Sequence, residues 1–288
     1  MPAPLTPVRR GARGYVLISV LWLGVALLTG MAAFLSSARQ EATVARAEIT
    51  ALRADALART GLNLALARLA ETLENAEDPG AGLRRDGTPS VIDLAEGRIT
   101  IRVEDEAGKV DLRHAPPQVL GPVLTSLGQR TGIDAFAAAN LAEGFADLNP
   151  MEGGRPVDLR MLLRRAGLDA HAAEIASRHL TLLNGTPKVD PISASPAVLI
   201  AIPGLGPSDV ETILTRRASG GPLPQLGSAM VWIGPRTGPV FTVRVQAELS
   251  TGGIGRIEAV VGARGLDFQG GAMRFDVLSF ERAEGDVL

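Results

Sequence analysis

The sequence predicts an α+β protein in which a long N-terminal helix packs on a small antiparallel sheet and a large all-helical region is inserted between the strands. Two patterns carry this prediction. A charge-free run near the N-terminus is followed by a stretch rich in Ala, Leu, Arg and Glu, which are strong helix formers. Apolar and polar residues then alternate twice, over residues 99–104 and again over residues 241–249, with the period of half-buried strands.

Composition excludes several classes of protein. The chain has 288 residues, of which 46% are hydrophobic, so it is long and apolar enough to bury a core and is unlike a disordered chain. It has no cysteine, which excludes disulfides, thiolate nucleophiles and cysteine-bound metals. A formal net charge of −2 provides no general electrostatic attraction for nucleic acid.

The charge-free run extends from Tyr15 to Ala38. A bilayer core needs about 20 apolar residues, whereas the apolar part of a secretory signal is typically about 7–15 residues long. We therefore predict a membrane-spanning helix over residues 15–38. A long signal peptide that is cleaved after Ser36-Ser37-Ala38 is the alternative.

The flanking charges predict the orientation of this span. Arg9, Arg10 and Arg13 precede it without any acidic residue, whereas both signs of charge follow it. The positive-inside rule then leaves the N-terminus in the cytoplasm and sends the rest of the chain across the membrane.

The helix is expected to continue beyond the membrane over residues 39–77. No proline occurs between Pro7 and Pro79, and a stripe of leucines follows one helix face at Leu62, Leu66, Leu69 and Leu73. Gly61 is expected to weaken this pattern locally. We expect the leucine stripe to pack against the globular part.

The sheet is expected to come from two segments that are far apart in sequence, residues 83–112 and 236–282. In the second segment Phe241, Val243, Val245, Ala247 and Leu249 should face the core, and Thr242, Arg244, Gln246 and Glu248 the opposite, solvent side. A turn over 250–255, a strand over 256–262 and a last strand over 275–281 should follow.

The region between them, residues 113–228, is expected to be an inserted helical domain of two related units. Lys109–Leu120 aligns with Lys188–Leu199, with identical Lys, Val, Asp, Ala, Pro, Val and Leu at matching positions. Each copy reads as a short extended segment that leads into a helix, with Pro117 or Pro196 near the first helical position.

The second copy continues into a helix-hairpin-helix or SAM-like pattern around Pro203, Gly204 and Gly206. In DNA-binding versions of such hairpins the backbone amides contact a phosphate. Here Asp209 and Glu211 lie beside those amides and would repel a phosphate, so a structural role is expected.

A membrane helix that follows a short basic leader ending in Gly14 and continues into a folded head resembles the type IV pilin and pseudopilin families. The resemblance implies that residues 1–14 are a prepilin leader, that prepilin peptidase cuts between Gly14 and Tyr15, and that Tyr15 is then N-methylated. Ser19 occupies the position at which most members carry glutamate. One branch typically lacks this glutamate and has an inserted helical domain: minor pseudopilin K (general secretion pathway protein K) of the type II secretion system.

This resemblance implies a non-enzymatic subunit at the tip of the periplasmic pseudopilus, which acts in assembly and protein export. It would be a single-pass protein of the inner membrane with its head in the periplasm. Its partners would be other minor pseudopilins of the tip complex, the major pseudopilin and prepilin peptidase. Nucleic acid is not expected as a partner.

The search for chemistry identifies no enzyme motif: the HExxH, P-loop and GxSxG patterns are absent. His171, Glu174 and His179 are loosely spaced for a metal site, and surface histidines are the simpler interpretation. No cofactor is expected to be required. Pseudopilins bind calcium, and calcium takes oxygen ligands. The candidate acidic residues are Glu104, Asp105, Glu106, Asp111, Asp147, Glu152 and Asp158. No ligand set can be assigned among them, and the alternative interpretation is that they are solvated charges in loops.

Two alternatives stay open at this point. The helix-hairpin-helix would suit a membrane-anchored periplasmic DNA-binding protein. Cleavage after Ala38 would instead release a soluble binding protein.

Overall fold

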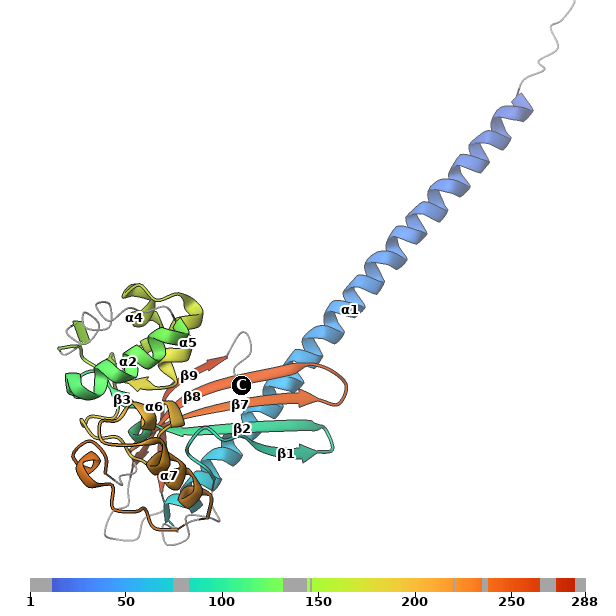
Figure 1. Ribbon diagram of the computed structural model, residues 1–288. Coiled ribbons are helices and arrows are strands. Elements are labelled where there is room, and N and C mark those ends of the chain that lie inside the picture. The colour runs from blue at the N-terminus through green and yellow to red at the C-terminus, as the bar shows by residue number, and fades with distance from the viewer. Residues whose placement is uncertain are drawn as a thin grey trace, which may run out of the picture. The chain divides into compact units, whose positions relative to one another are not determined.

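The computed structural model describes residues 12–74, 83–131, 144–145, 147–219, 221–234, 238–264 and 273–282 (Figure 1). The chain divides into two compact units, Met1–Leu52 and Arg53–Leu288. Helix α1 (Ala12–Glu74) contains the described part of the first unit and begins the second.

In the first unit, the part of α1 that follows Val16 has no buried side chain up to Leu52. The most apolar window of α1 has a mean hydropathy of 2.2 and contains no buried residue, so by length and composition it can cross a membrane. The long apolar N-terminal helix that the sequence predicts is therefore present.

The second unit contains a five-stranded sheet in the order β1-β2-β7-β8-β9, and all of its neighbouring strands are antiparallel. The strands are β1 (Ser90–Leu94), β2 (Gly97–Asp105), β7 (Val240–Leu249), β8 (Ile254–Arg264) and β9 (Arg274–Arg282). Strand β2 pairs with β7 from Gly97 opposite Leu249 to Asp105 opposite Phe241, so the two distant alternating segments form a single sheet.

Helix α1 packs on this sheet through small and large apolar side chains together. Leu62 and Leu69 are buried, whereas Leu66 and Leu73 are partly buried at the edge of the same cluster. The contact also uses alanines that the leucine pattern did not single out, and the cluster includes Leu57, Ala58, Ala65, Ile99, Ile101, Val103, Phe241, Val243, Val245, Ala247, Ile257, Ala259 and Val261.

Gly61, which the sequence marks as a local interruption of the helical pattern, has a packing role that the pattern does not indicate. A Cβ atom at Gly61 would lie 2.6 Å from Val245 Cγ1 and 2.7 Å from Ile99 Cγ2. The missing side chain is what lets the helix approach strands β2 and β7 closely.

The prediction that one side of β7 faces solvent is wrong. Every residue from Phe241 to Ala247 is buried, including Thr242, Arg244 and Gln246. The alternation predicts correctly which residues share a face, but both faces of this central strand are covered. The polar face must therefore be satisfied by partners other than water.

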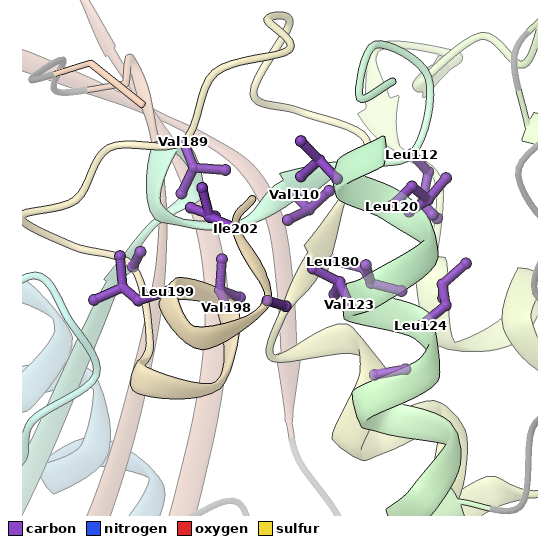
Figure 2. Packing of buried hydrophobic residues seen from close by; sticks show 14 of the residues in the cluster. Val110, Leu112, Leu120, Val123, Leu124, Leu180, Val189, Val198, Leu199 and Ile202 are labelled. Carbon is purple, nitrogen blue, oxygen red and sulfur yellow. The ribbon is translucent and has the colours of Figure 1, made fainter. Parts of the chain in front are cut away.

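Helices and short strands occupy the sequence between β2 and β7: η1 (Glu106–Gly108), β3 (Val110–Asp111), α2 (Pro117–Thr131), β4 (Met151–Glu152), β5 (Arg155–Pro156), α4 (Leu159–Arg165), α5 (Ala170–Ser177), β6 (Leu180–Thr181), α6 (Pro196–Ala201), α7 (Pro207–Ser219) and η2 (Gly227–Val231). They have a hydrophobic core of their own, distinct from that of the sheet. Figure 2 shows side chains of β3, α2, β6 and α6 gathered in it, among them Val110, Leu120, Leu180 and Val198.

The two copies of the sequence repeat fold in the same way. In the first, Asp111 Oδ1 accepts a hydrogen bond from the Arg113 amide at 2.8 Å. In the second, Asp190 Oδ1 accepts one from the Ile192 amide at 3.0 Å. Each aspartate thus closes a turn in its own backbone, and a helix that starts with proline follows at α2 and at α6.

Candidate functional site

The N-terminal part of α1 holds the residues to which the resemblance assigns processing. Gly14 and Tyr15 lie within the helix, although the structure does not describe their side chains, and Ser19 is exposed on it. The first eleven residues of the expected leader lie outside the described residues. Cleavage, methylation and the role of Ser19 therefore stay predictions.

The hairpin between α6 and α7 uses its glycines as expected. Gly204 has a φ of +87°, in the region that favours glycine, and a Cβ there would meet Ser228 Oγ at 2.7 Å. The Gly206 amide donates to Asp209 Oδ2 at 2.8 Å. The Asp209 carboxylate therefore accepts the hydrogen bond of a hairpin amide that a phosphate would need.

Arg217, near the end of α7, is not available to a phosphate either. Arg217 Nε donates to the Pro191 carbonyl at 2.7 Å, and its Nη2 donates to the Ala194 carbonyl at 2.6 Å. Burial lowers the pKa of Arg217 to about 10. Arg217 thus holds the turn that leads into α6, and this geometry favours a structural role for the hairpin.

A network of charged side chains covers the polar face of β7. Arg244 is nearly buried, pairs with Glu104 of β2, and places Nε 2.9 Å from Glu258 Oε2 of β8. Lys109 Nζ lies 2.9 Å from Glu104 Oε2 and 2.8 Å from Glu106 Oε1. The network thus crosses three neighbouring strands and continues into the segment after β2.

The network also reaches the helices. Arg160 of α4 places Nη2 3.1 Å from Glu258 Oε1 and Nη1 3.5 Å from Glu174 Oε2 of α5. A cavity of about 90 Å³ lies beside it, lined by charged and hydroxyl side chains that include Glu106, Thr181, Thr242 and Ser279. These ion pairs join the sheet to the helical segment, and each buried cation is matched by carboxylates.

The charges inside this network control one another's ionisation. Burial works against the ionised form of Glu104, but the positive charges of Lys109 and Arg244 outweigh it and hold the pKa of Glu104 at about 2. Burial likewise opposes the charge on Arg244, while Glu104 and Glu258 raise its pKa above the ordinary value. A buried charge without a partner destabilises the folded state. The charged residues of this network therefore stabilise the fold only when all of them are present.

Sequence reasoning missed this network, although one signal was available. Arg244 lies on the alternating polar face of β7, opposite Glu258 of β8 and opposite Arg102 of β2, two residues from Glu104. Recognising the network requires the order of the strands in the sheet, and the period of the sequence does not give that order.

Five of the seven acidic groups considered for calcium have other partners. Asp105 accepts from the Ala107 amide at 2.9 Å and the Gly238 amide at 3.1 Å, and burial raises its pKa to about 7. Asp111 accepts from the Gly185 amide at 2.7 Å, and Asp158 from the Arg160 amide at 2.9 Å. Asp147 and Glu152 are exposed.

Nor do the histidines form a cluster. Glu174 pairs with Arg160 and Arg178, and His179 Nδ1 lies 2.8 Å from Ser195 Oγ. In the part of the chain that the structure describes, no group of three or more His, Asp or Glu side chains is placed to hold a metal ion. Calcium binding stays a prediction without assigned ligands.

Comparison with solved structures shows which known protein has a similar fold. No protein-family model matches the chain, and no curated protein matches its sequence. A chain in the crystal structure of the GspK-GspI-GspJ complex from the enterotoxigenic Escherichia coli type 2 secretion system is similar, with a TM-score of 0.51 and 14% identity. The match covers 84% of this chain and 99% of that chain. At this identity it shows the fold, so the chain has a pseudopilin-like fold.

Proposed function

We propose that the protein is a minor pseudopilin of the type II secretion system, of the K type, that acts in pseudopilus assembly and protein export. The single observation that carries this proposal is the fold, which matches a chain of a pseudopilin complex over 99% of that chain's length. The exposed apolar helix at the N-terminus adds a membrane anchor of the required length.

The proposed mechanism is assembly without catalysis. The apolar part of α1 holds the subunit in the inner membrane, with the N-terminus in the cytoplasm and the head in the periplasm. The subunit joins other minor pseudopilins there, and its large head at the tip blocks the addition of further subunits above it. The major pseudopilin would then continue the filament below.

Processing would occur at the start of α1. Prepilin peptidase would cut between Gly14 and Tyr15, and Tyr15 would become the methylated N-terminus. Ser19 carries no charge, so it cannot form the ion pair that a glutamate makes with a neighbouring subunit's terminal amine. The subunit would still offer its own amine to a neighbour, which suits a position at one end of a filament.

The length of the apolar run favours an anchor over a cleaved signal peptide. Residues 15–38 carry no charge and are long enough to cross a bilayer as a helix, whereas the apolar part of a secretory signal is typically about 7–15 residues long.

Intact-mass measurement of the mature protein tests the processing. We expect a chain that begins at methylated Tyr15, and we expect Gly14→Leu to leave the precursor uncut and secretion lost, because a bulky side chain replaces glycine at the cut. Gly30→Leu, farther along the same helix with no atom within 4 Å of an added Cβ, is the control and should be processed normally. A mature chain that starts at Arg39, or normal processing of the Gly14 variant, would contradict the proposal.

Co-purification tests the partners. The chain from Arg39 onward should bind the soluble parts of minor pseudopilins of the same secretion system and elute with them in size-exclusion chromatography. Failure with every minor pseudopilin of that system would contradict the proposed role. A gel-shift titration at two salt concentrations tests DNA binding, and the proposal expects no salt-dependent affinity.

A further inference from the structure

A heptad pattern begins in the last residues of the apolar run of α1 and continues beyond it. Its apolar positions are separated alternately by three and four residues, which places them along one stripe of the helix, and all six side chains are exposed: Leu35, Ala38, Ala42, Ala45, Ile49 and Leu52. We call these six residues the seam. The exposed fractions of its largest side chains are 43% for Leu35, 50% for Ile49 and 67% for Leu52. The seam lies entirely within the first compact unit.

Opposite charges border the two edges of the seam. Arg39 and Arg46 follow Ala38 and Ala45 and lie seven residues apart, so both line one edge. Glu41 and Glu48 precede Ala42 and Ile49 and line the other edge. In heptad terms, the e positions carry arginine and the g positions carry glutamate.

These charges are not spaced for pairing within their own helix. Intrahelical ion pairs join residues three or four apart, whereas each arginine here is two residues from the nearest glutamate and has none three or four residues away. Among the described residues, Arg39, Glu41, Arg46 and Glu48 take part in no ion pair. By contrast, Asp55 and Arg59, farther along α1, do form an i,i+4 pair.

The same charges are complementary between two parallel helices. In a parallel two-stranded coiled coil, a g residue faces the e residue of the next heptad on the partner, so Glu41 of each chain would face Arg46 of the other. In an antiparallel pair, g faces g and e faces e, which would bring like charges together. The pattern therefore selects a parallel partner with the same arrangement.

We propose that the seam binds a second copy of this chain as a parallel coiled coil next to the membrane, before any filament is assembled. This inference rests on the membrane anchoring within the proposed function, because two chains inserted in the same direction present their helices in parallel. Anchoring also confines the chains to one surface, which raises their effective concentration and lets a short seam act.

Cysteine cross-linking in membranes tests the contact, since the native chain has no cysteine. The full chain, expressed alone, carries Ala45→Cys in the seam or Ala47→Cys on the opposite face, both at exposed alanines of the same helix. Mild oxidation should convert the Ala45→Cys protein to a disulfide-linked dimer, because paired seam positions come within disulfide distance, and should leave the Ala47→Cys protein monomeric. Equal cross-linking of the two variants, or none in the seam variant, would overturn the proposal.

Charge reversal in the Ala45→Cys background tests the orientation. Arg46→Glu should lower the cross-linking yield at least about threefold, because two attractive pairs become repulsive. Adding Glu41→Arg should restore the yield by exchanging the charges on both edges. An unchanged yield after the single reversal, or no recovery in the double variant, would refute the parallel pairing.

The mass of the cross-linked product identifies the partner. A product of twice the chain mass supports a second copy, and a product that contains only a different protein overturns it. Because the chain is expressed without other secretion subunits, this result is independent of whether it acts as a pseudopilin.

Discussion

Gly61 shows how one residue sets the distance between a helix and a sheet. An added Cβ would come within 2.6 Å of Val245 and 2.7 Å of Ile99, and both contacted atoms are attached directly to the Cβ of strand residues. Those side chains have little freedom to move away because they are themselves fully packed in the core.

Gly61→Ala should therefore destabilise the protein. Overpacking typically costs about 1–3 kcal/mol, which exceeds the gain of up to about 1 kcal/mol from alanine's higher helix propensity. The matched control is Thr60→Ala, at the exposed neighbouring position of α1, where alanine's higher helix propensity should appear as a small stabilisation. Urea unfolding of both variants measures the difference, and equal effects of the two substitutions would contradict this account.

Glu104 is the residue whose ionisation should be most visible in stability. Its pKa of about 2 in the folded protein lies below the ordinary value of 4.5. The ionised form therefore stabilises the fold above pH 4.5, and this contribution is lost as the pH falls from 4.5 toward 2.

Glu104→Gln should lower the free energy of unfolding by about 3 kcal/mol at neutral pH, because Lys109 and Arg244 lose a buried counter-charge. The difference from the wild type should shrink below pH 4.5, where the wild type loses the same charge. Denaturant unfolding at a series of pH values measures it, with exposed Glu96→Gln as control. A pH-independent difference would show that charge is not the cause.

At the scale of elements, the two copies of the repeat are joined by one side chain. Asn184 is buried, and its Nδ2 donates to the carbonyl of Lys109 at 3.2 Å and to that of Lys188 at 3.0 Å. These two lysines are the first residues of the two copies. A single amide thus fixes the starts of both units, which the alignment alone could not indicate because Asn184 lies outside both copies.

Asn184→Ala should lower the free energy of unfolding by about 1–3 kcal/mol, since it leaves the buried Lys109 carbonyl and the partly buried Lys188 carbonyl without their donor. Asn149→Ala is the control: Asn149 is exposed and accepts one hydrogen bond from the Met151 amide at 3.1 Å, so its loss should cost less than about 1 kcal/mol. Thermal unfolding compares the two variants, and a similar small loss in both would rule out the bridging role of Asn184.

The elements themselves were largely predictable, whereas their environment was not. Alternation over 99–104 and 241–249 correctly indicates β2 and β7, because strand period depends only on local geometry. The burial of Arg244 was not predictable, because it depends on β7 lying in the middle of the sheet and on what covers its polar face.

At the scale of the whole molecule, the two compact units differ in what stabilises them. In the described part of α1, Ala54 is the first buried residue, and both hydrophobic cores use residues from Leu57 onward. The apolar run of α1 precedes these residues and contributes to neither core. Its apolar surface is therefore available to a membrane.

A chain that begins at Arg39 should consequently fold as the full-length head does. We expect its free energy of unfolding to stay within about 0.5 kcal/mol of the full chain in detergent, because no buried contact is removed. A chain that begins after Leu62 is the comparison, and it should unfold because it lacks Leu57, Ala58 and Leu62 from the sheet core. Circular dichroism and urea titration distinguish the two shortened chains. A large loss of unfolding free energy in the chain that begins at Arg39 would contradict the division into two units.

Local pattern in the sequence by itself determined the long helix, the strand segments, the helix starts of the repeat and the glycines of the hairpin. Each of these depends on side-chain period, charge or backbone freedom over a few neighbouring residues. Tertiary structure alone decided the register of β2 on β7, the close approach at Gly61 and the pairing of Arg244 with Glu104, whose positions differ by 140 residues. The physical reason is that these features are contacts between distant segments, and a contact has no signature in either segment considered separately.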